Sequence, residues 1–240
     1  MQDGRSNYHT GQPFKQFSKG VRTGLPVAIG YMPIATAFGA LAIKANLSPQ
    51  ETVLMSACVF AGASQFMAIT MMLQSADGIQ IVIATLFINL RHLVMSMAVH
   101  HVVQSPNRLW RALLSFGITD ETFALLTLQK TRTKTDSSPF FAAGLIGIAY
   151  SSWVAGTAFG SLGSRIIPLS ISAAMTIGLY AMFIGLVMPH VRRSVRVACI
   201  TGISMTLNTV LAPMMDSGWA IVISTILGAS FGLLWKETAM

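Results

Sequence analysis

The chain has 240 residues, of which 53% are apolar and only 10% are charged. A soluble domain carries about 25% charged residues, and the mean hydropathy here is +0.62, so the composition excludes a soluble globular protein. Long apolar runs recur along the whole chain, and about 20 such residues span a bilayer. The sequence therefore predicts an all-α, polytopic integral membrane protein.

The formal net charge of +8 would suggest a nucleic-acid partner in a soluble chain. In a membrane protein, basic loops held at the cytoplasmic face explain the same charge, so no nucleic-acid partner is expected. Cys58 and Cys199 lie in apolar segments without a CxxC motif or a His/Cys cluster, and no metal site or cofactor is predicted. The polar start of the chain does not resemble a cleaved signal.

Taken in chain order, seven apolar segments predict transmembrane helices: 21–43, 53–74, 79–104, 139–163, 166–188, 197–215 and 217–235. An eighth segment, 112–129, carries Asp120 and Glu121 at its middle. Two central acids cost about 5–7 kcal/mol on the insertion scale, whereas the large apolar residues of the segment return about 2.5–5 kcal/mol. This helix would barely insert on its own.

The distribution of basic residues favours counting this segment as a span. With eight spans and cytoplasmic termini, eleven of the 16 Lys and Arg fall inside, four fall outside, and Arg91 lies within the membrane. That asymmetry is the one expected of loops facing the cytoplasm. The predicted organisation is a cytoplasmic tail over 1–20, one transmembrane transport domain over 21–235, and a cytoplasmic tail over 236–240.

A repeated tetrapeptide suggests an internal duplication of four plus four helices. The tetrapeptide Thr-Ala-Phe-Gly occurs at 36–39 and again at 157–160, and Asn89 and Asn208 stand at a similar separation. Transporters often contain such duplications, although a match of four residues can also arise by chance in so narrow a composition.

Polar residues gather on one face of the predicted helix 79–104. At 100° per residue, an arc of about 80° holds Thr85, Asn89, His92, Ser96 and His100. Such a stripe fits a water-accessible pathway, and hydrogen bonding between helices is the alternative.

Arg91 points about 100° away from His92 on the same helix and therefore needs another anionic partner. Asp120 and Glu121 are the only acids deep in any span. We expect Arg91 to pair with one of them, which would help helix 112–129 to insert. The second acid could then exchange a proton or bind a substrate ammonium group, whereas a purely structural ion pair is the alternative.

Further candidates lie where the sequence predicts irregular helix geometry. Pro26 and Pro33, with Gly30 between them, predict a broken helix that exposes backbone groups to a substrate; a simple kink is the alternative. Gly62, Ser64 and Gln65 in segment 53–74, and Asn208 in segment 197–215, could line the pathway or bond neighbouring helices. No HExxH, GxSxG or GxxxxGK[ST] motif is present, so no enzymatic activity is predicted.

Three blocks of sequence carry a resemblance to a known family. They are Gly24-Leu25-Pro26 through Leu41-Ala42, Phe60-Ala61-Gly62-Ala63-Ser64-Gln65-Phe66, and Ile88-Asn89-Leu90-Arg91-His92. These blocks resemble the AzlC family, the large subunits of bacterial branched-chain amino acid exporters. The likeness in length and hydropathy runs from about Gly20 to Trp235, although Ala35 stands where the family often has Gly.

The resemblance implies a secondary transporter subunit in the bacterial inner membrane. It implies export of leucine, isoleucine, valine and sometimes methionine, driven by protons, together with a small AzlD-type membrane subunit. Two alternatives remain open at this point: a transporter of another small metabolite, and an assembly subunit without a pathway of its own.

Overall fold

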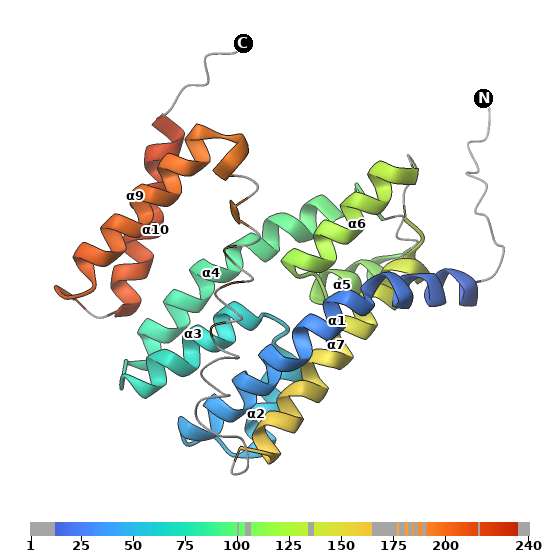
Figure 1. Ribbon diagram of the computed structural model, residues 1–240, viewed down its shortest axis with the longest axis horizontal. Helices are drawn as coiled ribbons and strands as arrows, with labels where there is room; N and C mark the ends of the chain where they lie inside the picture. The colour runs from blue at the N-terminus through green and yellow to red at the C-terminus, as the bar shows by residue number, and fades with distance from the viewer. Residues whose placement is uncertain are drawn as a thin grey trace. The chain divides into compact units, whose positions relative to one another are not determined.

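The computed structural model describes residues 13–99, 101–103, 107–133, 137–164, 191–215 and 217–234, with five isolated positions between 177 and 188. Their regular structure is helical apart from one isolated parallel bridge between Val103 and Ser137. The named helices are α1 (Pro13–Lys44), α2 (Pro49–Cys58), α3 (Gly62–Leu73), α4 (Gly78–Val99), α5 (Arg108–Phe116), α6 (Asp120–Thr133), α7 (Pro139–Leu162), α9 (Val195–Leu211) and α10 (Ser217–Leu234) (Figure 1).

The prediction of an all-helical structure is confirmed for this part of the chain. Three of its helices, α1, α4 and α7, are long and apolar enough to cross a membrane, and α3, α9 and much of α10 form shorter apolar helices. The predicted segment 139–163 coincides with α7. Segment 166–188 lies largely outside the described residues.

Two predicted spans are interrupted near their middles. Segment 53–74 is divided into α2 and α3 by Val59–Ala61, where Val59 has an extended backbone with φ −128° and ψ 91°. Segment 112–129 is divided into α5 and α6 by Gly117–Thr119. Each interruption leaves the ends of two short helices inside an apolar segment, where free backbone groups need local partners.

The prediction that the prolines break the first helix is wrong. α1 is one continuous helix through both Pro26 and Pro33. A proline removes only the hydrogen bond to the carbonyl four residues earlier, which here belongs to Arg22 and Ile29, and the helix continues on both sides of each. The Ser152 hydroxyl donates to the neighbouring Ala28 carbonyl at 2.5 Å.

Side chains fix the start of several helices. Ser48 and Glu51 form a reciprocal capping box at the beginning of α2. The backbone N–H and the hydroxyl of Ser48 both donate to the Glu51 carboxylate and lower its pKa. Asn107 caps α5 in a similar way by accepting from the N–H of Trp110 at 2.9 Å. These contacts replace the missing carbonyl partners of the first helical turn.

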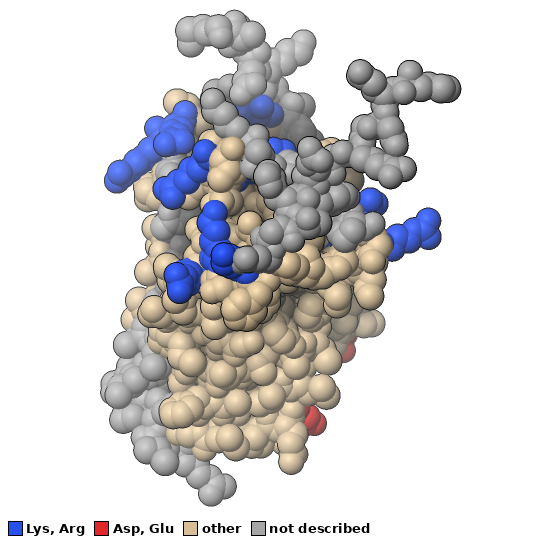
Figure 2. Space-filling view, turned by 90° about the vertical axis from the view of Figure 1, so that its right-hand side faces the viewer, with Lys and Arg blue, Asp and Glu red and all other residues tan. Residues whose placement is uncertain are grey.

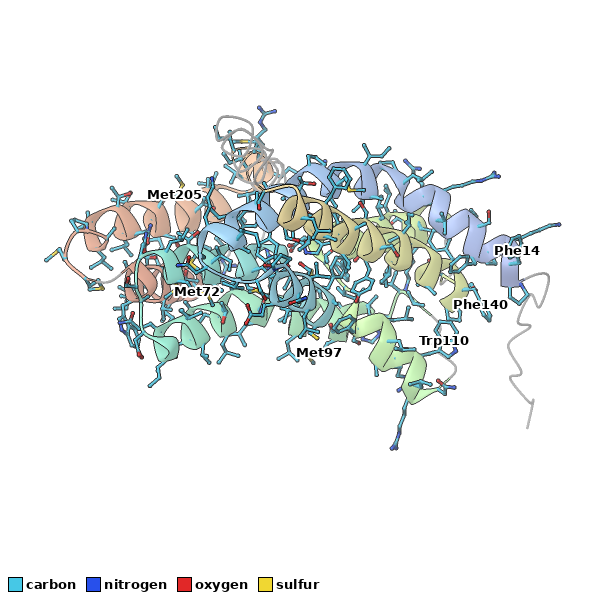
Figure 3. All side chains as sticks on the ribbon, turned by 90° about the horizontal axis from the view of Figure 1, so that it is seen from below. Phe14, Met72, Met97, Trp110, Phe140 and Met205 are labelled. Carbon is cyan, nitrogen blue, oxygen red and sulfur yellow. The ribbon has the colours of Figure 1, made fainter. Side chains whose placement is uncertain are left out.

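The chain forms two compact units. Unit 1 comprises residues 1–31 and 92–153, and unit 2 comprises residues 32–91 and 154–240. In unit 1, residues from α4 to α7 form the apolar core, which includes Leu114, Leu126 and Leu145. At its edge, Trp110 of α5 and Phe140 of α7 stack edge to face with ring centroids 5.4 Å apart (Figure 3).

In unit 2, Met71 of α3, Ala84 of α4 and Val222 of α10 form a buried cluster. Helices α9 and α10 are connected by a short turn and pack against each other. A hydrogen bond connects the two helices: Nε of Arg196 on α9 donates to the carbonyl oxygen of Gly232 on α10 at 3.0 Å.

Glycines allow α1 and α7 to approach closely within each unit. In unit 1, a Cβ atom on Gly20 would lie 2.0 Å from the Phe141 carbonyl oxygen, and one on Gly144 would lie 2.2 Å from that of Phe17. In unit 2, the two Thr-Ala-Phe-Gly repeats face each other. A Cβ atom on Gly39 would lie 2.3 Å from the Thr157 oxygen, and one on Gly160 would lie 2.0 Å from the Thr36 oxygen.

The described surface is largely uncharged. On the face shown in Figure 2, uncharged residues cover most of the area drawn. Large apolar side chains are exposed on many helices, including Leu93 and Met97 of α4 and Met205 of α9 (Figure 3). Such exposure is unusual for a soluble protein and is expected where helices contact lipid.

Candidate functional site

The first candidate site, in unit 1, lies at the start of α6. Thr119 ends the interruption after α5 and forms a reciprocal cap with Thr122. The N–H of Thr119 donates to the Thr122 hydroxyl at 2.8 Å, and the N–H of Thr122 donates back to the Thr119 hydroxyl at 3.3 Å. Threonine thus takes the role that glutamate or glutamine has in an ordinary capping box. The cap places Asp120 and Glu121 in the first turn of α6.

This position makes the two acids less costly than their place in the sequence suggests. The first turn of a helix carries a partial positive charge, which stabilises a carboxylate by about 0.3–1 kcal/mol. Segment 112–129 is not one helix with two acids at its centre but two short helices with the acids at the beginning of the second.

Glu121 also has a partner from a distant part of the chain. The hydroxyl of Tyr31, on α1, donates to Oε2 of Glu121 and lies 2.8 Å from Oγ1 of Thr119. The Tyr31 side chain is buried, and its ring packs edge-on against Trp153 of α7 with centroids 5.3 Å apart. Packing on one side and two oxygen partners on the other fix the phenol in one position.

The two oxygens of the Glu121 carboxyl group have different surroundings. Oε2 accepts from Tyr31, whereas Oε1 is buried and has no hydrogen-bond partner among the described residues. A buried carboxylate oxygen without a donor is costly when ionised. Oε1 is therefore the atom at which a proton or a cationic ligand would be most stabilising.

A second polar cluster lies in unit 2, at the interruption between α2 and α3. Gln65 donates through Nε2 to the Ser56 hydroxyl at 3.0 Å, and the hydroxyls of Ser56 and Thr157 are 2.8 Å apart. All three side chains are fully buried. The bonds tie the end of α2, the start of α3 and α7 together.

The predicted pathway residues of segment 53–74 are located at this interruption. Gly62 is the first residue of α3, and the Ser64 hydroxyl donates to the Ala61 carbonyl at 2.9 Å. Ala61 precedes the helix and has no side chain that could cap it. Gln65 thus bonds the start of α3 to the end of α2, whereas the Ser64 bond is local to the start of α3. A role of these residues in a pathway stays a prediction.

The predicted stripe on α4 is only partly described. Thr85 donates to the Ile81 carbonyl of its own helix at 2.7 Å, and Ser96 approaches the Ser115 carbonyl at 3.4 Å. His92 is half-buried, and His100 lies outside the described residues. Asn89 differs from these, because its amide oxygen is buried and has no hydrogen-bond partner in the described part of the chain.

The amide oxygen of Asn208, on α9, is also buried without a hydrogen-bond partner among the described residues. The predicted repeat pairs Asn208 with Asn89. Pro26, Gly30 and Pro33 are all exposed on α1, and a Cβ atom added at Gly30 would meet no atom within 4 Å. The helix is unbroken there, so these three residues offer a substrate no half-helix end.

The pairing of Arg91 with Asp120 or Glu121 stays a prediction, because Arg91 belongs to unit 2 and both acids belong to unit 1. We expect Arg91→Ala to lower the amount of protein in the membrane or its activity, since an isolated charge at mid-span is costly. A second substitution, Asp120→Asn or Glu121→Gln, should recover part of the membrane level measured by immunoblot. If neither double variant improves on Arg91→Ala, the pairing is wrong.

Sequence reasoning missed Tyr31, Thr119 and the Ser56–Thr157 bond. Tyr31 lies 90 residues before Glu121, so no local spacing connects them. The sequence does contain one indication of this contact: a tyrosine hydroxyl in an apolar span needs a hydrogen-bond partner. Thr119 followed by Thr122 also matches a helix start directly before two acids.

Comparison with known proteins finds one matching family and several similar membrane proteins. The profile of the family described as "AzlC protein" matches residues 26–167. An inner membrane protein of Escherichia coli, YgaZ, is 34% identical over 198 residues, which are 77% of each chain. An uncharacterised membrane protein of Archaeoglobus fulgidus is 34% identical over 185 residues, covering 76% of this chain and 80% of the relative.

A more distant relative has a functional name. It is the "branched-chain amino acid transport protein AzlC" of Bacillus subtilis, which is 26% identical over 139 residues, covering 58% of this chain and 54% of that protein. No solved structure matches the chain.

Proposed function

Since the chain belongs to the AzlC family, we propose that it is the large subunit of a secondary transporter in the bacterial inner membrane. The transporter exports branched-chain amino acids, namely leucine, isoleucine, valine and sometimes methionine. The name of the Bacillus subtilis relative supports this substrate class. The apolar composition and the helical structure support a role within the bilayer.

The observation that carries a proton-coupled mechanism is the Glu121 carboxyl group. It lies at the start of a half-helix within an apolar segment, and one of its oxygens is buried without a partner. Secondary transporters build their ion and substrate sites from interrupted helices of this kind. Glu121 takes up a proton in one conformation of the cycle and releases it in the other, so that the proton gradient drives export.

Each unit offers chemistry for an amino acid. In unit 1, an acid at the start of α6 suits the substrate ammonium group. In unit 2, Arg91 and the first N–H groups of α3 suit a carboxylate. The start of α3 supports this role because no side chain caps it. Methionine and phenylalanine side chains suit the branched apolar group.

The proposed topology has eight spans with both termini in the cytoplasm, as the distribution of basic residues favours. The interrupted pairs α2–α3 and α5–α6 then each count as one span. A small AzlD-type membrane subunit acts as the partner, as the family implies.

The test is the accumulation of amino acids in cells. A strain that lacks both this protein and the small partner subunit, loaded with a leucine-, isoleucine-, valine- or methionine-containing dipeptide, should retain the free amino acid longer than the parent strain. Expression of the chain together with its small partner subunit should restore export, whereas expression of either alone should not. Unchanged retention for all four amino acids would overturn the proposed substrate class.

A cysteine scan tests whether α4 lines the pathway. We expect a membrane-impermeant thiol reagent to label cysteine at positions 85, 89, 92, 96 and 100 much faster than cysteine at 87, 90 and 94, because the first set shares one polar face. The native Cys58 and Cys199 are first replaced by serine so that only the introduced thiol reacts. Equal labelling of both sets would favour hydrogen bonding between helices over a pathway.

A further inference from the structure

Tyr31 is the residue that links the proton-carrying group of the proposed transporter to the first helix. The contact is specific in two respects. The phenol hydroxyl bonds to Oε2 of Glu121 and not to Oε1. It also lies 2.8 Å from the hydroxyl oxygen of Thr119, the residue that caps α6. Three groups from α1, the interruption and α6 thus form one hydrogen-bonded chain.

The direction of the hydrogen bonds follows from the number of protons. A phenol has one proton to donate, and a bond to a carboxylate is stronger than one to a neutral hydroxyl. When Glu121 is ionised, Tyr31 therefore donates to Oε2 and accepts from the Thr119 hydroxyl. This arrangement stabilises the charge on the carboxyl group.

Tyr31 is the donor that the structure places on the Glu121 carboxyl group. Asp120 precedes Glu121 in the first turn of α6. α7 contributes Trp153, which packs on the Tyr31 ring and carries no charge. Asp120 disfavours a second negative charge beside it, whereas the Tyr31 donor favours that charge.

We propose that Tyr31 is a positioning residue for proton uptake by Glu121: it holds Oε2 and stabilises the ionised carboxylate, so that the proton adds to Oε1. Uptake converts the carboxylate to a neutral acid, with the proton supplied by water on one side of the membrane and released to water on the other. Oε2 continues to accept from Tyr31 in both states, and α1 stays attached to α6. The inference rests on the proposed function, in which Glu121 carries the proton.

The first test measures the protonation of Glu121 directly, without transport. The full chain is reconstituted in liposomes, and the infrared band of the protonated carboxyl group is followed against pH, with Glu121→Gln used to assign it. Tyr31→Phe keeps the ring on Trp153 and removes the donor, so the midpoint should move to higher pH by about one to two units. An unchanged midpoint, or a move to lower pH, would overturn the inference.

Tyr150→Phe is the matched control. Tyr150 lies on α7 in the same unit, and its ring packs edge-on against Phe116 with centroids 6.1 Å apart. This variant loses a tyrosine hydroxyl from the same unit, and we expect its midpoint to equal that of the unsubstituted protein. A shift as large as that of Tyr31→Phe would show that any tyrosine hydroxyl in this unit has the effect, which would also overturn the inference.

A second measurement needs no change at Tyr31 and serves if Tyr31→Phe does not fold. In protein made with isotope-labelled tyrosine, the C–O stretching band of one tyrosine should shift as Glu121 titrates, and the shift should be absent in Glu121→Gln. Absence of the band change in the unsubstituted protein would refute the contact. The proposed function is tested by a different result. It would be overturned if the unsubstituted protein exported no branched-chain amino acid, whatever the infrared midpoint.

Discussion

Glu121→Gln should abolish export driven by a pH gradient while the protein remains inserted at its normal level. Glutamine has nearly the same size, and its carbonyl oxygen can still accept from the Tyr31 hydroxyl. It cannot take up or release a proton, and it gives a substrate ammonium group no negative charge. The measurement is efflux of labelled leucine from proteoliposomes with an imposed pH gradient, normalised to the reconstituted protein.

Asp120→Asn provides the comparison at the adjacent position. It changes the charge by the same amount in the same turn of α6, and we expect it to reduce membrane insertion more than the export rate per molecule. Full pH-driven export by a well-expressed Glu121→Gln variant would remove the proposed role of Glu121. Loss of export in Asp120→Asn alone would transfer that role to Asp120.

Gly160→Ala should destabilise the protein strongly although it adds one methyl group. The new Cβ atom would lie 2.0 Å from the Thr36 carbonyl oxygen, well inside contact distance, so α1 and α7 would have to separate. Overpacking of this kind costs about 1–3 kcal/mol. We expect a fall of several degrees in the melting temperature in detergent, measured by intrinsic fluorescence of the tryptophans.

Gly147→Ala is the matched control on the same helix. A Cβ atom at this position would meet no atom within 4 Å, and alanine is a better helix former than glycine by about 1 kcal/mol. The control should melt at the same temperature as the unsubstituted protein or slightly above it. If both variants melt alike, the close approach of α1 and α7 at Gly160 is not a feature of the folded protein.

The hydropathy of the sequence was enough to predict the helices but not their interruptions. Segment 139–163 was predicted almost to the residue because α7 contains no charged residue and lies between Asp136 and Arg165. Segment 53–74 is equally apolar across the break, since Val59, Phe60 and Ala61 are all hydrophobic. Hydropathy counts side chains, whereas the interruption is a change of the backbone, so the pattern contains no sign of it.

The prediction of a break at the prolines was wrong for a related reason. A proline predicts where a backbone hydrogen bond is missing, but not whether the contacts of the helix with its neighbours keep it continuous. Ser152, which bonds the Ala28 carbonyl, lies 124 residues further along the chain. Contacts of this range, like that between Tyr31 and Glu121, depend on which helices meet, and a single sequence does not contain that information.

The contacts of the glycines also determine how this sequence can vary during evolution. At Gly117 the obstacle to a larger residue is the Ile146 side chain, 2.1 Å from the position of a Cβ atom, so a change to alanine could be accompanied by a smaller residue at 146. At Gly160 the obstacle is the main-chain carbonyl of Thr36, which every residue at 36 would present. Position 117 should therefore covary with position 146 among relatives, whereas position 160 has no partner whose substitution could make room for a side chain.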